Sequence, residues 1–157
     1  MQNIFNQDFR DFIQALNKFE IAYILVGGFS VILHGHSRVT GDMDIWINRT
    51  EENYNKLTKA FYEFGMSTFD MTKENFLHHP QWDVFHFGRK PVAIDIMTKV
   101  KGLDFDECFA LATEFEEDGL KIRTLHFNHL IESKKQAGRL KDLDDIEQLT
   151  RNKKIEP

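Results

Sequence analysis

Cysteine is nearly absent from this sequence, with Cys108 the only one among 157 residues. A single thiol excludes an internal disulfide and leaves too few sulfur ligands for the common structural zinc sites. Seven histidines are present, but His78-His79 and His86 match no common zinc spacing. Cys108 lies among apolar residues of an expected short helix, which favours a buried small hydrophobe over a nucleophile.

Long apolar runs are missing as well, since none reaches the roughly 20 residues that a membrane span requires. No secretory signal peptide opens the chain, so we expect a cytoplasmic protein without a membrane partner. Only three prolines occur, no linker rich in Pro, Gly or Ser divides the chain, and no repeat is visible. We therefore expect one domain over residues 1–157, long enough to bury a hydrophobic core.

Positive charge is in deficit, because 20 Lys and Arg residues stand against 25 Asp and Glu, a formal net charge of −5. This net charge argues against a protein that binds nucleic acid over its whole surface, although it does not exclude a local basic groove. Phenylalanine is abundant instead, with 15 residues. Phe5, Phe9, Phe12 and Phe19 recur at helical spacing, which predicts a core-facing helix over about residues 4–19.

A double glycine, Gly27-Gly28, follows the apolar run 22–26. The run predicts a buried strand, and the glycines predict a tight turn into a helix over about 28–35. Glycine lets a ligand approach the backbone closely, and the N–H groups of a first helical turn attract anions. One interpretation is a phosphate site at Gly27, Gly28 and Ser30, and the other is an ordinary turn.

Two carboxylates alternate with apolar residues in Asp42-Met43-Asp44-Ile45-Trp46-Ile47. The alternation predicts a strand over about 42–48 that carries Asp42 and Asp44 on one face. A half-exposed strand would explain this pattern, but Asp is depleted in strands, and paired carboxylates suit Mg²⁺. Asp95 interrupts another apolar strand, 92–98. If the strands are neighbours, Asp95 completes a two-metal site or takes the proton from an attacking hydroxyl.

The remaining elements follow from periodicity and turn residues. Gly88-Arg89-Lys90-Pro91 separates two apolar runs and predicts a hairpin of strands 83–88 and 92–98. Strands interleaved with helices and a hairpin predict a sheet of mixed direction. We further expect helices near 51–64, 105–112, 126–137 and 141–150, a strand pair within 113–124, and an irregular stretch after residue 64.

Three segments occur in a characteristic order: Gly27-Gly28-x-Ser30, Gly35-x-x-Arg38-x-Thr40-x-Asp42-x-Asp44, and Ile94-Asp95-Ile96. Together they resemble the nucleotidyltransferase superfamily of the DNA polymerase β type. A fourth segment, Leu130-Ile131-x-x-Lys134-x-x-x-Gly138-Arg139-x-Lys141-Asp142-x-x-Asp145-Ile146, is similar to a helical motif of its small bacterial branch. That branch includes minimal nucleotidyltransferases, aminoglycoside nucleotidyltransferases and AbiEii-like toxins. The resemblance spans about residues 20–150.

The resemblance implies an α/β (α+β) fold: a mixed sheet of about 4–6 strands flanked by helices, with C-terminal helices over about 126–150 packed on it. It implies transfer of NMP from an NTP to a hydroxyl acceptor, with release of pyrophosphate. Asp42, Asp44 and Asp95 would hold Mg²⁺ or Mn²⁺, with two ions expected. A small molecule, a tRNA 3′ end and a protein side chain all fit as acceptor. The alternatives are an antitoxin-like or regulatory protein that binds a partner protein, and an inactive nucleotide-binding fold, which the three intact acids disfavour.

Three further residues are assigned to the nucleotide: Arg38, Thr40 and Lys134. Arg38 either clamps a phosphate oxygen or forms an ion pair that holds one member of the acid pair. Lys134 either contacts the triphosphate or belongs to a solvated helix face. Asp142 and Asp145, three residues apart on one helix, are expected to brace that helix.

Overall fold

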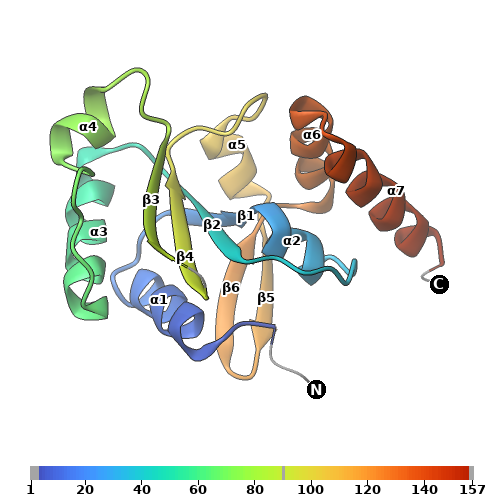
Figure 1. The fold of residues 1–157 in the computed structure, drawn as a ribbon, viewed down its shortest axis with the longest axis horizontal. Helices are drawn as coiled ribbons and strands as arrows, with labels where there is room; N and C mark the ends of the chain where they lie inside the picture. Colours follow the sequence, from blue (N-terminus) through green and yellow to red (C-terminus); the bar gives the residue numbers. More distant parts are fainter. Residues whose placement is uncertain (1–3, 90, 156–157) are drawn as a thin grey trace.

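Six strands form one mixed sheet in the computed structural model, which describes residues 4–89 and 91–155. Their order across the sheet is β3-β4-β2-β1-β6-β5 (Figure 1). β2 pairs with β4 and β1 with β6 in parallel, whereas the other neighbours are antiparallel. The predicted mixed sheet is thereby confirmed. The strands are β1 (Tyr23–Val26), β2 (Asp42–Ile47), β3 (Val84–Arg89), β4 (Val92–Met97), β5 (Thr113–Glu117) and β6 (Leu120–Thr124).

The helices agree with the predicted ones except in two places. One is α4, which forms within the stretch predicted to be irregular, because the Thr72 hydroxyl accepts a hydrogen bond from the Asn75 N–H at 3.1 Å. The other is the last helix, which continues past residue 150. None of the described helices has the length and apolar character needed to cross a membrane. The helices are α1 (Gln7–Lys18), α2 (Gly27–Leu33), α3 (Glu51–Phe64), α4 (Lys73–His78), α5 (Phe105–Ala110), α6 (Phe127–Ala137) and α7 (Leu140–Ile155).

One face of the sheet is covered by α1 and α3 (Figure 1). The Asn6 side chain accepts a hydrogen bond from the Phe9 N–H and starts α1. The phenylalanines predicted to face the core from this helix then pack against alternate residues of the central strands, such as Met43 and Ile94. Phe12 is fully buried there and makes an edge-on contact with Phe61, with 5.7 Å between the ring centroids.

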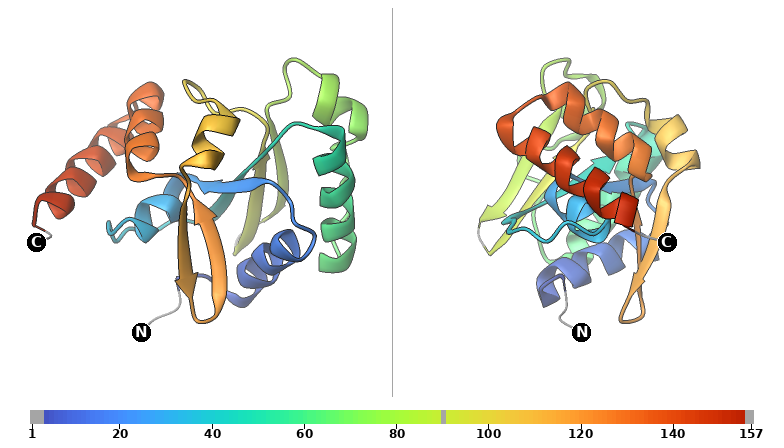
Figure 2. Two further views of the ribbon diagram at one scale, coloured as in Figure 1. Left: turned by 180° about the vertical axis from the view of Figure 1, so that it is seen from behind. Right: turned by 90° about the vertical axis from the view of Figure 1, so that its right-hand side faces the viewer.

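The other face is covered only in part, by α5 and the hairpin of α6 and α7 (Figure 2). Ile24 and Trp46 point into this second core and meet Leu130 and Leu149. Because side chains alternate along a strand, Asp42 and Asp44 lie on the same face as Trp46. That face is therefore apolar under the helices and acidic at the start of β2. Of the predicted single domain 1–157, residues 1–3, 156–157 and Lys90 in the hairpin turn lie outside the described residues.

We predict that Phe12→Ala lowers the free energy of unfolding by about 3–5 kcal/mol, because it leaves a cavity among packed rings. Tyr62→Ala is the matched control, since the Tyr62 side chain on α3 is 89% exposed. Urea denaturation of both variants measures the difference. Equal small losses in the two variants would contradict the packing role of Phe12.

Candidate active site

The acidic residues predicted from sequence meet at one edge of the partly covered face. Parallel pairing of β2 with β4 puts Asp44 directly opposite Asp95, and Asp42 opposite Ala93. Asp42 is exposed at the start of β2, Asp44 is half-buried, and the Asp95 side chain is 20% exposed. Asp44 interacts directly with Asp95 and feels the charge of Asp42, so the three acids form a cluster that solvent can reach. Their carboxylate oxygens, in the described structure, do not all lie within 4.8 Å of one another.

The cluster carries negative charge that the protein does not neutralise. Burial, followed by the charges of Asp95 and Asp42, raises the pKa of Asp44 to about 7, while Lys134 acts in the opposite direction. In the described part of the chain, no lysine or arginine forms an ion pair with Asp42 or Asp44. Hard oxygen donors with unbalanced charge are the donor set that Mg²⁺ and Mn²⁺ prefer, so these residues fit the expected ions.

The glycine turn lies against the same carboxylates. Gly27 has φ +69°, and a Cβ added there would come within 2.1 Å of Asp44 Oδ2. A Cβ on Gly28 would meet Thr40 Oγ1 at 2.6 Å. Both glycines are therefore needed to bring the start of α2 against Asp44 and the half-buried Thr40, in addition to any ligand they admit.

Ser30 does not face the cluster. Its side chain is fully buried, and its hydroxyl lies 2.6 Å from that of Thr124 on β6. The predicted phosphate contact of Ser30 therefore disagrees with this structure. Strand pairing between β1 and β6 is the reason, because Thr124 also donates to the Leu25 carbonyl and draws Ser30 into the core.

Lys134 is buried and ion-paired, so it does not belong to a solvated helix face, and its contact with the triphosphate stays a prediction. Its Nζ lies 3.2 Å from Asp142 Oδ1 and 3.1 Å from Asp145 Oδ2, and both acids are buried. Burial alone would raise the pKa of Asp142, but hydrogen bonds from Arg139 and Lys134 outweigh it and hold that pKa below its usual value. The predicted bracing role of the two acids agrees with these contacts, and the positive charge of Lys134 still reaches Asp44.

Arg38 joins the same network instead of pairing with Asp42 or Asp44. Its Nη1 lies 2.5 Å from Asp145 Oδ2 and ties the loop after α2 to α7. Asp144, Asp145 and His36 each offer one possible ligand atom, a carboxylate oxygen or a ring nitrogen, and these atoms all lie within 4.8 Å of one another. Arg38 and Lys134 already neutralise Asp145, which weakens these three residues as a cation site.

His86 is the site residue that sequence reasoning missed. Antiparallel pairing of β3 with β4 puts it opposite Asp95, with 2.6 Å between His86 Nδ1 and Asp95 Oδ1. The turn predicted at 88–91 does not place His86 there, because the hairpin closes one residue later, with Arg89 opposite Val92. The exposed imidazole thus borders the cluster on the β3 side.

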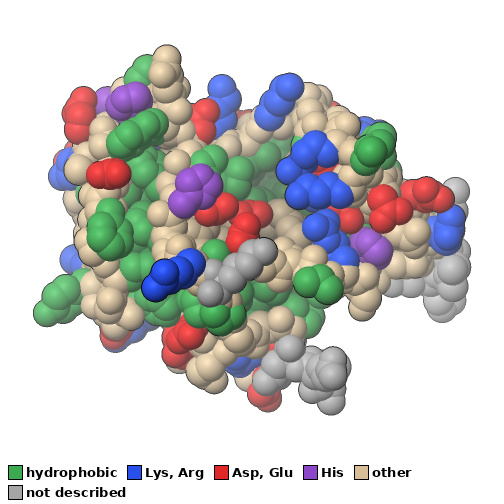
Figure 3. Space-filling view, viewed as in Figure 1, with side chains coloured by type: hydrophobic (Ala, Val, Ile, Leu, Met, Phe, Trp, Pro, Cys, Tyr) green, Lys and Arg blue, Asp and Glu red, His purple; other side chains and the backbone are tan. Residues whose placement is uncertain are grey.

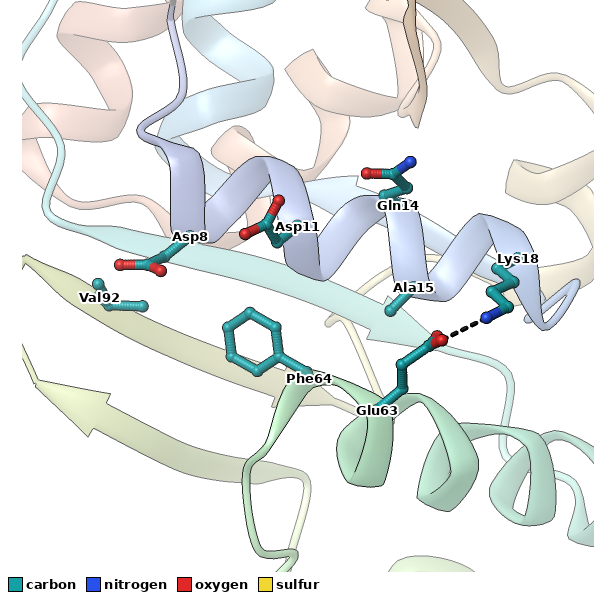
Figure 4. Close-up of a pocket in the computed structure, with 8 residues that line it drawn as sticks. All are labelled: Asp8, Asp11, Gln14, Ala15, Lys18, Glu63, Phe64 and Val92. Carbon is teal, nitrogen blue, oxygen red and sulfur yellow. Dashed lines mark hydrogen bonds and ion pairs between the residues drawn. The ribbon is translucent and has the colours of Figure 1, made fainter.

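Basic and apolar groups flank the acids on opposite sides. Figure 3 shows Asp and Glu side chains at the centre, basic side chains toward α6 and α7, and hydrophobic side chains toward β3 and α4. Arg139, whose side chain is 59% exposed, is among the basic residues of the α6–α7 junction. A cleft of about 630 Å³ between α1 and α3 opens on the other face of the sheet (Figure 4). Its walls carry Asp8, Asp11 and Glu63 but none of the residues above.

A family described as "Nucleotidyl transferase of unknown function (DUF2204)" matches residues 5–156. The chain belongs to this family. Membership in DUF2204 identifies an enzyme of the nucleotidyltransferase type and confirms the resemblance to that superfamily. No curated protein matches the sequence.

Solved structures share the fold of this DUF2204 member. The lincosamide antibiotic adenylyltransferase LnuA, in its lincomycin-bound structure, gives a TM-score of 0.61 at 16% identity over 95% of this chain and 98% of its own. A Thermotoga maritima protein described as a nucleotidyltransferase gives 0.58 at 14%, covering 92% and 91%. An antigenic nucleotidyltransferase-like protein from Paracoccidioides brasiliensis gives 0.58 at 16%, covering 89% and 72%. At such identities the likeness concerns the fold alone, and it confirms the nucleotidyltransferase fold.

We predict that Asp44→Asn stabilises the metal-free DUF2204 enzyme. The folded-state pKa of Asp44, about 7, lies above the ordinary value of 3.8, so the folded protein retains a proton that the unfolded chain releases. Wild-type stability therefore falls as pH rises between these two values and stays lowered above them. The variant carries no charge at this position, so its melting temperature in EDTA should exceed that of wild type by several degrees above pH 7.

The excess should shrink toward zero below about pH 3, where wild-type Asp44 is protonated in both states. Asp42→Asn is the matched control, because Asp42 is exposed and should change the melting temperature less. A lower melting temperature for Asp44→Asn at pH 8 would contradict the charge repulsion described here.

Proposed function

We propose that the protein transfers a nucleoside monophosphate from an NTP to a hydroxyl acceptor. The acceptor oxygen attacks the α-phosphorus, the bond between the α-phosphorus and its bridging oxygen breaks, and pyrophosphate leaves. The hydroxyl proton passes to Asp95. The observation that carries this proposal is the register of β2 against β4, which sets Asp44 beside Asp95 with Asp42 two residues away.

Asp42, Asp44 and Asp95 would hold Mg²⁺ or Mn²⁺, with two ions as the expected number. Such ions stabilise the negative charge that develops on the phosphates during transfer. The backbone at Gly27 lies against Asp44 and that at Gly28 against Thr40, and this turn would offer a close approach to the triphosphate.

The α6–α7 side of the cluster supports the placement of the triphosphate. Lys134 and Arg139 both interact electrostatically with Asp44, so their positive charge extends over the cluster. All three basic side chains are paired with Asp142 or Asp145, but that of Arg139 is 59% exposed and can reach a phosphate directly, whereas those of Lys134 and Arg38 are 7% and 21% exposed. We therefore assign the phosphate contact to Arg139 and a supporting electrostatic role to Lys134 and Arg38.

LnuA supports a small-molecule hydroxyl as the acceptor, since that adenylyltransferase of the same fold has lincomycin bound. The four NTPs would be compared by incubating the protein with each α-labelled form, Mg²⁺ or Mn²⁺, and a cell extract. Label transferred to an acceptor, with pyrophosphate released, is the expected result.

We predict that Asp42→Asn and Asp44→Asn each lower nucleotidyl transfer by about 10³-fold or more while the fold persists, because either change removes a ligand of the metal ions. Asp144→Asn is the matched control, since Asp144 is an exposed acid on α7 outside the cluster. Transfer from the α-labelled NTP measures all three. Wild-type activity in either cluster variant would refute the mechanism.

A further prediction distinguishes the two roles open to Asp95. If Asp95 acts on the acceptor hydroxyl, Asp95→Asn should bind Mg²⁺·NTP nearly as tightly as wild type and lose turnover, because two carboxylates and the phosphates still coordinate the ion. Calorimetric titration with Mg²⁺ and with EDTA measures the affinity. An affinity loss equal to that of Asp44→Asn would make Asp95 a metal ligand and remove its role as base.

A further inference from the structure

A groove of about 300 Å³ runs along the free edge of β3, between this strand and the turn that follows α3. We call it the β3-edge groove. Its volume suits one ring system and lies at the lower end of ligand-site sizes. The lining is mainly apolar and aromatic: Phe69, Met71, Trp82, Val84, Phe85 and Phe87.

Phe69 holds a conformation that folding alone does not explain. Its backbone has φ +45°, a value that a bulky aromatic residue rarely adopts, and its side chain is 71% exposed. An exposed ring gains little from burial, so the strained turn keeps an aromatic surface over the groove without stabilising the core. Strain of this kind occurs preferentially at ligand-binding sites.

His86 connects the β3-edge groove to the carboxylate cluster. The imidazole forms part of the groove wall, and its Nδ1 lies 2.6 Å from Asp95 Oδ1. A hydroxyl seated at the His86 end of the groove is therefore beside Asp95, the residue to which we assign the acceptor proton. Basic side chains approach the cluster from the α6–α7 side instead (Figure 3). Arg139 and Lys134, on the α6–α7 hairpin, interact electrostatically with Asp44.

The charge of the β3-edge groove restricts its ligand. Asp70 is in its wall, and among the described residues no lysine or arginine lines it. The charge of Asp70 would repel a phosphate backbone or a carboxylate in the groove. A neutral ligand, or one with an amine directed at Asp70, fits this electrostatic pattern.

We propose that the β3-edge groove is the acceptor site and that it takes a small alcohol or phenol with an apolar ring, uncharged or cationic. This inference rests on the proposed function and specifies the acceptor of the same site. The ring packs against Phe69 and Trp82, and the hydroxyl lies toward His86 and Asp95. Its oxygen bonds to the α-phosphorus as pyrophosphate leaves, and its proton passes to Asp95.

Tyramine is the probe, because it joins a phenol hydroxyl to an apolar ring and an amine. With α-labelled NTP and Mg²⁺, we expect saturable formation of nucleotidyl-tyramine. Phe69→Ala should raise the tyramine KM about tenfold, as expected for an aromatic contact, without changing NTP affinity. Tyr62→Ala, which removes an exposed aromatic side chain outside the groove lining, should leave the KM unchanged.

Asp70→Asn gives a second test, because a mere loss of packing would change the KM for tyramine and for 4-ethylphenol alike. It should raise the KM for tyramine and leave that for 4-ethylphenol unchanged, because only tyramine carries the amine. The anion 4-hydroxyphenylacetate and a single-stranded oligoribonucleotide should be far poorer acceptors than tyramine. Equal use of either, or a tyramine KM insensitive to both Phe69→Ala and Asp70→Asn, would overturn the acceptor assignment.

Hydrolysis of the NTP to NMP and pyrophosphate, with water as acceptor, tests the proposed function separately. If wild type binds Mg²⁺·NTP and hydrolyses it but neither binds nor modifies tyramine, the acceptor assignment is wrong and nucleotidyl transfer stands. If wild type neither binds Mg²⁺·NTP nor hydrolyses it, the proposed function fails, and the acceptor assignment that rests on it fails as well.

Discussion

Electrostatic repulsion between Asp44 and Asp95 opposes the pairing of β2 with β4 at the centre of the site, so other interactions must hold these strands together. The two carboxylates face each other because β2 and β4 pair in parallel, and burial adds to the free-energy cost of ionising both. Apolar neighbours on the same strands offset that cost. Ile45 and Ile94 pack under α1 and α3, and Trp46 packs under α5, so hydrophobic burial on both faces holds the strands in a register that the acids alone would oppose.

The buried ion network between α6 and α7 partly offsets the negative charge of Asp44, because the positive charge of Lys134 acts on it. The charge of buried Lys134 is neutralised by Asp142 and Asp145, which offsets the free-energy cost of removing it from water. Asp145 also forms an ion pair with Arg38. Removing one member would leave an unpaired buried charge, so the network fixes the α6–α7 hairpin relative to the loop that precedes β2. Arg139 is thereby held at the edge of the cluster with its guanidinium accessible.

Local patterns in the sequence were enough for much of this arrangement. Alternation of acidic and apolar residues identified β2, the double glycine identified the turn into α2, and the hairpin residues identified β3 and β4. The failures concern partners that are distant in the chain. Ser30 bonds to Thr124, 94 residues away, and Arg38 pairs with Asp145, 107 residues away, and neither pairing leaves a local trace. His86 was missed for a more local reason, because the hairpin closes with Arg89 opposite Val92, one residue later than a turn at 88–91, and that shift puts His86 opposite Asp95.

The position of β3 at the end of the sheet has a consequence for which substitutions the fold tolerates. A central strand such as β2 is constrained by neighbours on both edges, so substitutions there disturb the acids themselves. β3 has one free edge, and the turn after α3 belongs to a connection between helices, where changes in length and composition are tolerated. Substitutions in the walls of the β3-edge groove can therefore change its shape and charge while the pairing of β2 with β4 stays intact.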